Sequence, residues 1–158
     1  MPQPVQWDIA RASEIVEAHT HRDGAALPVL HALQEEFGFV ADEAIPLIAS
    51  ALNLSRAEVR GIVTFYHDFR RQPPGRHVLK LCRAEACQSM GAPRLARQIL
   101  EQEGVDWGGT TADGALTIEA VYCLGLCVCA PAALYDGEPV ARLDATTLAT
   151  LSREARQA

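Results

Sequence analysis

All five cysteines of this 158-residue chain lie in its second half, and four of them form two closely spaced pairs. Four residues separate Cys82 from Cys87, and three separate Cys123 from Cys127. Four thiolates are the number that a [2Fe-2S] cluster or a structural zinc ion needs. An odd cysteine count without a recognisable export signal argues against a disulfide framework, because cytosolic thiols are kept reduced. The paired cysteines are therefore candidate metal ligands.

The spacing within each pair favours two irons over one zinc ion. Zinc knuckles usually contain Cys-x2-Cys, in which a tight turn aims both sulfurs at a single ion. Loops of four and three residues give the sulfurs a wider span, which suits two ligand pairs that serve two irons. The missing Cys-x2-Cys also argues against a thioredoxin-type thiol-disulfide oxidoreductase. From the residues alone, an iron-sulfur cluster is favoured, and zinc or unliganded thiols are the alternatives.

Small and apolar residues surround both pairs and would give a cluster a suitable environment. The backbone N–H groups expected to point at cluster sulfides belong to Gln88, Ser89, Gly91 and Gly125 and to the backbone around them. The apolar residues expected to exclude water are Ala84, Ala86, Leu124, Leu126 and Val128. Cys129 is the surplus thiol, and we interpret it as a small buried hydrophobic residue, because free cysteines are commonly buried. The alternative is that Cys129 takes the place of Cys127 as a ligand.

The elements predicted around the cysteines place both pairs close to strand ends. Strands are predicted over 77–81 and 116–121, with a helix over 89–103 between them. Asp136-Gly137 favours a tight hairpin turn between two further short strands, and Asp144 caps a last helix. This order is that of a small sheet with helices packed on it, and it fits a thioredoxin-like arrangement. Cysteines at the ends of two strands in one sheet can converge on a shared centre.

The first 70 or so residues instead predict four amphipathic helices. Apolar residues recur at helical spacing over 9–16, 25–37 and 42–52, and Ser55 with Glu58 forms a capping box for a fourth helix. We interpret an aromatic cluster at the end of that helix as core, and part of a partner surface is the alternative; its members are Phe65, Tyr66, His67 and Phe69. Two prolines and a glycine at 73–75 forbid continued helix, which predicts domains over 1–74 and 75–158.

Composition and charge exclude several classes of function. The formal net charge is -6 and no run of five basic residues occurs, so nucleic acid is not an expected partner. The first residues lack the pattern of a secretory signal, which predicts a cytoplasmic protein. Glu119, Gly125 and Pro131 interrupt the most apolar stretch, so we expect no membrane insertion.

The segments 82–91 and 123–127 resemble the ligand loops of the thioredoxin-like [2Fe-2S] subunit family. This family includes the 24 kDa subunit of respiratory NADH dehydrogenase and the matching subunits of NAD-reducing hydrogenases and soluble NAD-dependent formate dehydrogenases. The segments 30–40 and 59–69 look like the helical part of the same family. Within the first ligand loop, 83–86 and 88–91 are most similar to the gamma subunit of the formate dehydrogenases.

The resemblance implies an α/β protein in which an N-terminal helical bundle precedes a thioredoxin-like [2Fe-2S] ferredoxin domain with a small mixed sheet. It implies that Cys82 and Cys87 ligate one iron and that Cys123 and Cys127 ligate the other. The implied role is electron transfer without a catalytic site of its own, as a subunit of an NAD-linked oxidoreductase. Its implied partner is a flavin subunit that carries FMN and binds NAD, and through that subunit a molybdenum-containing, formate-oxidising subunit.

The helical domain 1–74 carries no ligand, and we interpret it as the part that binds the flavin subunit. The equivalent subunit of respiratory NADH dehydrogenase or of an NAD-reducing hydrogenase is the closest alternative function. A zinc-stabilised adaptor module is the alternative from a different class of protein, because structural zinc needs the same four thiolates.

Overall fold

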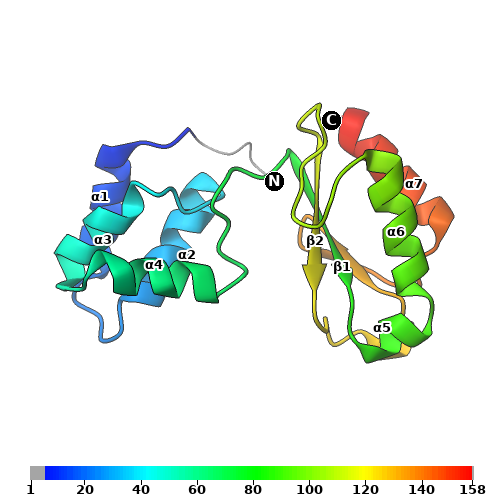
Figure 1. The fold of residues 1–158 in the computed structure, drawn as a ribbon, viewed down its shortest axis with the longest axis horizontal. Helices are drawn as coiled ribbons and strands as arrows, with labels where there is room; N and C mark the ends of the chain where they lie inside the picture. Colours follow the sequence, from blue (N-terminus) through cyan, green and yellow to red (C-terminus); the bar gives the residue numbers. More distant parts are fainter. Residues whose placement is uncertain (1–5, 158) are drawn as a thin grey trace. The chain divides into compact units, whose positions relative to one another are not determined.

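The computed structural model describes residues 6–157, and the chain divides into two compact units that join at Pro73 and Pro74 (Figure 1). The first unit contains the helices α1 (Ile9–His19), α2 (Ala26–Phe37), α3 (Ala44–Leu52) and α4 (Arg56–Phe65). The second unit contains a four-stranded sheet and the remaining helices. The mixed α/β architecture predicted from the sequence is thereby confirmed. None of the described helices combines the length and apolar character that a membrane crossing requires.

Local signals in the sequence set the ends of the helices in the first unit. Asp8 precedes α1, and its carboxylate accepts hydrogen bonds from the backbone N–H groups of Ala10 and Arg11. The predicted capping box begins α4, where Ser55 and Glu58 each accept a hydrogen bond from the other's backbone N–H. The apolar faces of the helices then form one core, whose largest fully buried members are Phe37, Leu30, Leu33 and Ile48.

The aromatic cluster at the end of α4 is only partly core, so its prediction as core was wrong for three of its residues. Phe69 is buried and stacks edge-on against His31. Phe65 is 73% exposed and Tyr66 is 43% exposed, and their rings meet edge-to-face with centroids 5.1 Å apart. His67 is exposed as well. Helical periodicity cannot identify this outcome, because α4 ends at Phe65 and the chain leaves the helical direction there.

The sheet of the second unit is mixed, with strand order β2-β1-β3-β4. β1 (His77–Cys82) pairs in parallel with β2 (Leu116–Val121) and antiparallel with β3 (Ala133–Tyr135), which forms a hairpin with β4 (Glu138–Val140). The hairpin turn at Asp136-Gly137 has positive φ angles of 51° and 88°, as its sequence predicts. α6 (Ala92–Glu103) and α7 (Ala145–Gln157) pack against each other and against this sheet (Figure 1).

The helix predicted over 89–103 begins at Ala92 in the structure, and a further short helix that was not predicted precedes it. A short helix, α5 (Glu85–Ser89), precedes α6, and Gly91 separates them with a φ of +91°. Glycine adopts this left-handed conformation without a steric penalty, and Pro93 then favours the start of a new helix. Cys87 consequently lies on α5, whereas the sequence placed it in a loop before the helix.

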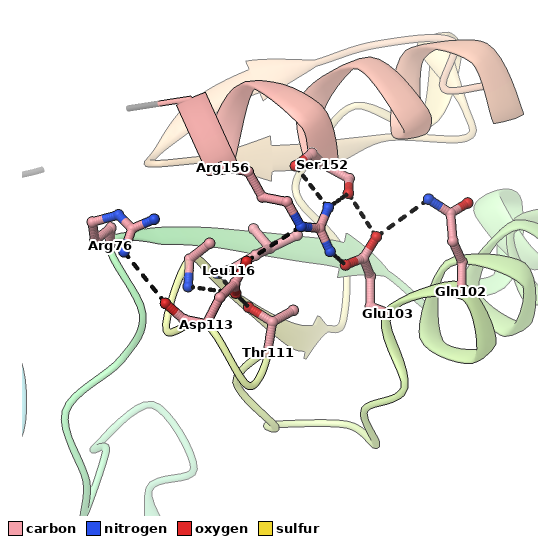
Figure 2. A network of polar contacts seen from close by, with 9 residues as sticks. Arg76, Gln102, Glu103, Thr111, Asp113, Leu116, Ser152 and Arg156 are labelled. Atoms are coloured by element: carbon pink, nitrogen blue, oxygen red, sulfur yellow. Dashed lines mark hydrogen bonds and ion pairs between the residues drawn. The ribbon is translucent and has the colours of Figure 1, made fainter.

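A buried carboxylate of α6 forms hydrogen bonds with two residues of α7 (Figure 2). The Glu103 side chain is 1% exposed, and it accepts hydrogen bonds from the Ser152 hydroxyl (2.6 Å) and from the Arg156 guanidinium. The same guanidinium lies 3.3 Å from the carboxylate of Asp113, in the segment that leads into β2. Three segments that are distant in the sequence therefore share one polar network.

Removing the cation of this network should destabilise the second unit. Arg156→Ala leaves the buried Glu103 carboxylate without its charged partner, and we expect the free energy of unfolding to fall by about 1–3 kcal/mol. Arg153→Ala is the matched control, because Arg153 is exposed on the same helix. Urea denaturation followed by circular dichroism measures both, and equal midpoints for the two variants would contradict the structural role of Arg156.

Candidate metal centre

Parallel pairing brings the first two ligand segments to one edge of the sheet. Cys82 is the last residue of β1, and its pairing partner is Val121, the last residue of β2. Because parallel strands run in the same direction, both chains leave the sheet at the same edge. Cys123 follows two residues after Val121. The backbone N–H of Cys82 also donates to the carbonyl of Ala132 (3.1 Å), so the segment that leads into β3 reaches this edge as well.

The first cysteine pair is buried. Cys82 and Cys87 are each 3% exposed, and each thiol shifts the pKa of the other. The short helix α5 determines this arrangement, since it turns the chain back directly after β1 and directs the Cys87 side chain inward. Cys82 and Cys87 share a small core with the apolar residues Ala92 and Ala132.

The second cysteine pair lies at the surface. Cys123 and Cys127 are both exposed, and their sulfur atoms are 3.9 Å apart. Cys123 has a φ of 73°, a left-handed conformation that is uncommon for a residue with a side chain, and Gly125 has a φ of 76°. These two positions fold the segment back on itself, so that Cys127 begins the short 3-10 helix η1 (Cys127–Cys129) next to Cys123.

A small hollow is lined by three of the four paired cysteines, and Cys123 is not part of its lining. Its walls include Cys82, Cys87 and Cys127, and the other lining residues are Ala84, Ala86, Leu124, Leu126 and Ala132. Four of the five apolar residues predicted to exclude water are thus at the site. Val128 was predicted wrongly, because it is 96% exposed. It lies within η1, where its side chain projects outward while Cys127 faces the hollow.

The thiols differ in their electrostatic environment. Burial by itself would raise the pKa of Cys82, but the N–H groups of Ala84, Cys123 and Leu124 and the Cys87 thiol bring that pKa below its usual value. Burial and the neighbouring Cys82 thiol raise the pKa of Cys87. The neighbouring Cys123 thiol raises the pKa of Cys127. The buried sulfur of Cys82 is therefore surrounded by groups that stabilise negative charge.

Two of the N–H groups expected near the cluster form hydrogen bonds within helix α5 and its end. The N–H of Gln88 donates to the carbonyl of Ala84, and the N–H of Gly91 donates to that of Gln88, so helix α5 and its end use both groups. The N–H groups of Ala84, Cys123 and Leu124 lower the pKa of Cys82, and the N–H of Ala132 lowers that of Cys87. Every residue except proline has a backbone N–H, so residue type carries no signal for these donors.

Cys129 is half-buried, so its prediction as a fully buried hydrophobic residue was wrong. Its backbone N–H donates to the carbonyl of Leu126, and its own carbonyl accepts from the N–H of Arg142 (2.8 Å). Among the residues that the structure describes, the lining of the hollow includes Cys127 but not Cys129.

The donor set fits a [2Fe-2S] cluster, in which each of two irons takes two protein thiolates. The sulfurs of Cys123 and Cys127 contact each other, and the apolar hollow is lined by Cys127 and by both members of the buried pair. Across residues 6–157, no group of three or more His, Cys, Asp or Glu side chains is arranged to hold a single metal ion. Backbone N–H groups at the sulfurs complete the environment that such a cluster requires.

Comparisons with known proteins identify the family of this chain. The sequence profile of the thioredoxin-like [2Fe-2S] ferredoxin family matches residues 12–156. The NADH-quinone oxidoreductase of Pseudomonas aeruginosa contains a subunit that is 38% identical over 130 residues, which cover 81% of this chain and 78% of that protein. The HndA subunit of the NADP-reducing hydrogenase of Solidesulfovibrio fructosivorans is 31% identical over 131 residues, which cover 83% and 75%.

A solved structure has the same fold. The crystal structure of an NAD+-reducing [NiFe]-hydrogenase in the air-oxidized state aligns with a TM-score of 0.70 and 27% identity over 84% of this chain. This chain spans only 23% of the length of that hydrogenase chain. The chain belongs to the thioredoxin-like [2Fe-2S] ferredoxin family, whose cofactor is a [2Fe-2S] cluster. Its relatives are subunits of oxidoreductase complexes, and it is an electron-transfer subunit of this general kind.

Substitution of single cysteines tests the ligand assignment. We expect Cys127→Ser to lose the visible absorbance and most of the iron, because serine is a poor replacement for a thiolate at a cluster. Cys129→Ser is the matched control, two residues away in η1, and it should keep both signals. Iron analysis and absorption spectroscopy measure the outcome. Loss of iron in Cys129→Ser with retention in Cys127→Ser would assign the fourth ligand to Cys129.

Proposed function

We propose that this chain is the [2Fe-2S] electron-transfer subunit of an NAD-linked, flavin-containing oxidoreductase, in particular the gamma subunit of an NAD-dependent formate dehydrogenase. The observation that carries the proposal is the meeting of two cysteine pairs at one edge of the sheet, in a chain of the [2Fe-2S] ferredoxin family. Cys82 and Cys87 would hold one iron, and Cys123 and Cys127 the other. A bound cluster supplies one-electron chemistry and needs no substrate-binding residues in this chain.

Backbone N–H groups and apolar side chains of this chain set the electrostatic environment of the proposed cluster. The N–H groups of Ala84 and Leu124 stabilise negative charge on the Cys82 sulfur, and this is one of the factors that set a reduction potential. Leu124 and Leu126 exclude water from the hollow. Low exposure on this side favours electrostatic control by fixed N–H dipoles over control by solvent.

The exposed pair would face the partner that exchanges electrons. Cys123 and Cys127 lie at the surface, whereas Cys82 and Cys87 are buried. Two large apolar side chains adjoin the exposed pair in the sequence: Tyr122 is 69% exposed and Val128 is 96% exposed. Exposed apolar side chains next to a functional group are typical of a protein contact surface. We propose that this face contacts the flavin subunit. The FMN of that subunit would exchange single electrons with the cluster, and the same subunit would bind NAD.

The helical domain 1–74 would bind the same subunit. Its core is complete in itself, yet Phe65 and Tyr66 remain at the surface. Aromatic residues are enriched in the buried centres of protein interfaces. An exposed aromatic pair on an otherwise independent helical unit therefore supports a partner-binding role.

The segments 83–86 and 88–91 support the narrower proposal of a formate dehydrogenase, since they are most similar to that branch of the family. In such a complex, electrons reach the flavin subunit from a molybdenum-containing subunit that oxidises formate. The relatives named above are subunits of NADH-quinone oxidoreductase and hydrogenase complexes, and these are the alternative placements for this chain.

The assay of the purified native complex tests the proposal. We expect two irons per copy of this chain, a rhombic EPR signal after reduction, and formate-dependent reduction of NAD+. A complex that oxidises hydrogen or passes electrons from NADH to a quinone would replace the formate assignment and leave the electron-transfer role intact. One zinc ion per chain and no EPR signal would overturn the electron-transfer role itself and favour an adaptor.

A charge introduced at the aromatic pair tests the role of the helical unit. Phe65→Glu should weaken co-purification with the flavin subunit at least about tenfold, because a contact of about 1.4 kcal/mol corresponds to that factor. The unit should stay folded, since Phe65 is mostly exposed. Ile9→Glu is the matched control: Ile9 is also an exposed apolar residue of this unit. Equal binding by both variants would show that the aromatic pair is not the contact.

A further inference from the structure

A second and larger hollow lies beside the proposed cluster site within the second unit. Its volume is about 730 Å3, within the range of ligand-binding clefts. One wall is the side of α6 that carries Arg97 and Glu101, and another is the segment 104–107 that follows this helix. Arg83 and Gln88 complete it, and each directly follows a proposed cluster ligand. We call this feature the α6 groove.

The α6 groove combines an apolar wall with charged rims. Leu100, Val105 and the indole of Trp107 provide apolar surface. The Arg83 guanidinium lies over the Trp107 ring, 4.8 Å from its centroid, so one cation is held at the wall of the groove. A second cation, Arg97, projects from α6 into the same space.

The charges at the rims have no partners within the described part of the chain. Over residues 6–157, the side chains of Arg97, Glu101 and Asp106 form neither ion pairs nor hydrogen bonds. At the end of the same helix, by contrast, the Glu103 carboxylate is paired with Arg156. The charges that face the groove thus remain available to a ligand.

The positive and negative charges of the α6 groove lie toward opposite ends of it. Arg97 precedes Glu101 by one helical turn, so the cation lies nearer the start of α6. Arg83, next to the proposed cluster ligand Cys82, adds a second positive charge. Asp106, beyond the end of α6, adds a second negative charge to that of Glu101. A small anion would complement only the two arginines and would leave both carboxylates without partners.

We propose that the α6 groove binds a protein segment of the flavin subunit. That segment would place an acidic side chain opposite Arg83 and Arg97, an apolar side chain against Trp107, and a basic side chain opposite Glu101 and Asp106. This inference rests on the proposed function only for the identity of the partner. The arginines recognise a carboxylate through paired N–H donors, which gives the contact direction as well as strength. The groove would thereby fix the orientation of the partner beside the cluster.

Charge reversal in the assembled complex tests the proposal. Arg97→Glu in the full chain, co-expressed with the flavin subunit, should weaken the binding of that subunit at least about tenfold, since like charges across an interface are unfavourable. Glu101→Arg should weaken it as well, because the groove needs both rims. Arg94→Glu is the matched control: Arg94 is exposed on the same helix, and it is not among the residues that line the groove.

Two further measurements separate the possible outcomes. A photo-crosslinking residue in place of Arg97 should join a single segment of the flavin subunit, whereas the same residue in place of Arg94 should not. Equal subunit binding by Arg97→Glu and wild type, or retention of a small anionic molecule in native mass spectrometry with subunit binding unchanged, would overturn the proposal. Iron content and the EPR signal of each variant report on the cluster separately. Absence of iron and of the EPR signal from the wild-type complex would reject the proposed function. The crosslink would still show whether the α6 groove contacts the flavin subunit.

Discussion

The parallel pairing of β1 with β2 is the constraint on which the rest of the second unit depends. Its register places Cys82 opposite Val121, so both strands end at one edge and the segment with Cys123 and Cys127 starts beside Cys82. A shift of one residue would direct the alternate side chains toward the hollow, because side chains of a strand alternate between the two faces. The antiparallel addition of β3 brings the third segment to the same edge through the carbonyl of Ala132.

The network around Glu103 supports this pairing from the other side of the unit. α6 connects β1 to β2, and its position limits how the two strands can be aligned. The buried Glu103 carboxylate fixes the end of α6 against α7, and Arg156 extends the contact to Asp113 before β2 begins (Figure 2). The polar network thus holds the helix whose other side forms the wall of the α6 groove.

The site is asymmetric, and the asymmetry has a chemical use. One cysteine pair is buried among N–H donors and apolar side chains, and the other pair is at the surface. Burial with directed N–H groups controls the charge of a redox centre, whereas exposure allows a partner to approach it. A centre that was buried on every side would be separated from its partner by protein. If the two cysteine pairs are the ligands, as proposed, different segments of the same edge of the sheet would meet these two needs.

Signals between neighbouring residues were enough to define most local elements and the composition of the candidate site. Helical periodicity, the Ser55 capping box and the Asp136-Gly137 turn predicted elements that the structure confirms, because these signals act over short distances along the chain. The spacing of the cysteines and the family resemblance indicated a cluster, and the four ligands stay a prediction. Which groups meet depended on the tertiary fold. It began the helix predicted over 89–103 at Ala92, brought the N–H groups that lower the pKa of Cys82 to that thiol, and left Phe65 and Val128 at the surface. Burial and the direction of a backbone N–H depend on segments that are far apart in the chain, and residue type and periodicity carry no record of those contacts.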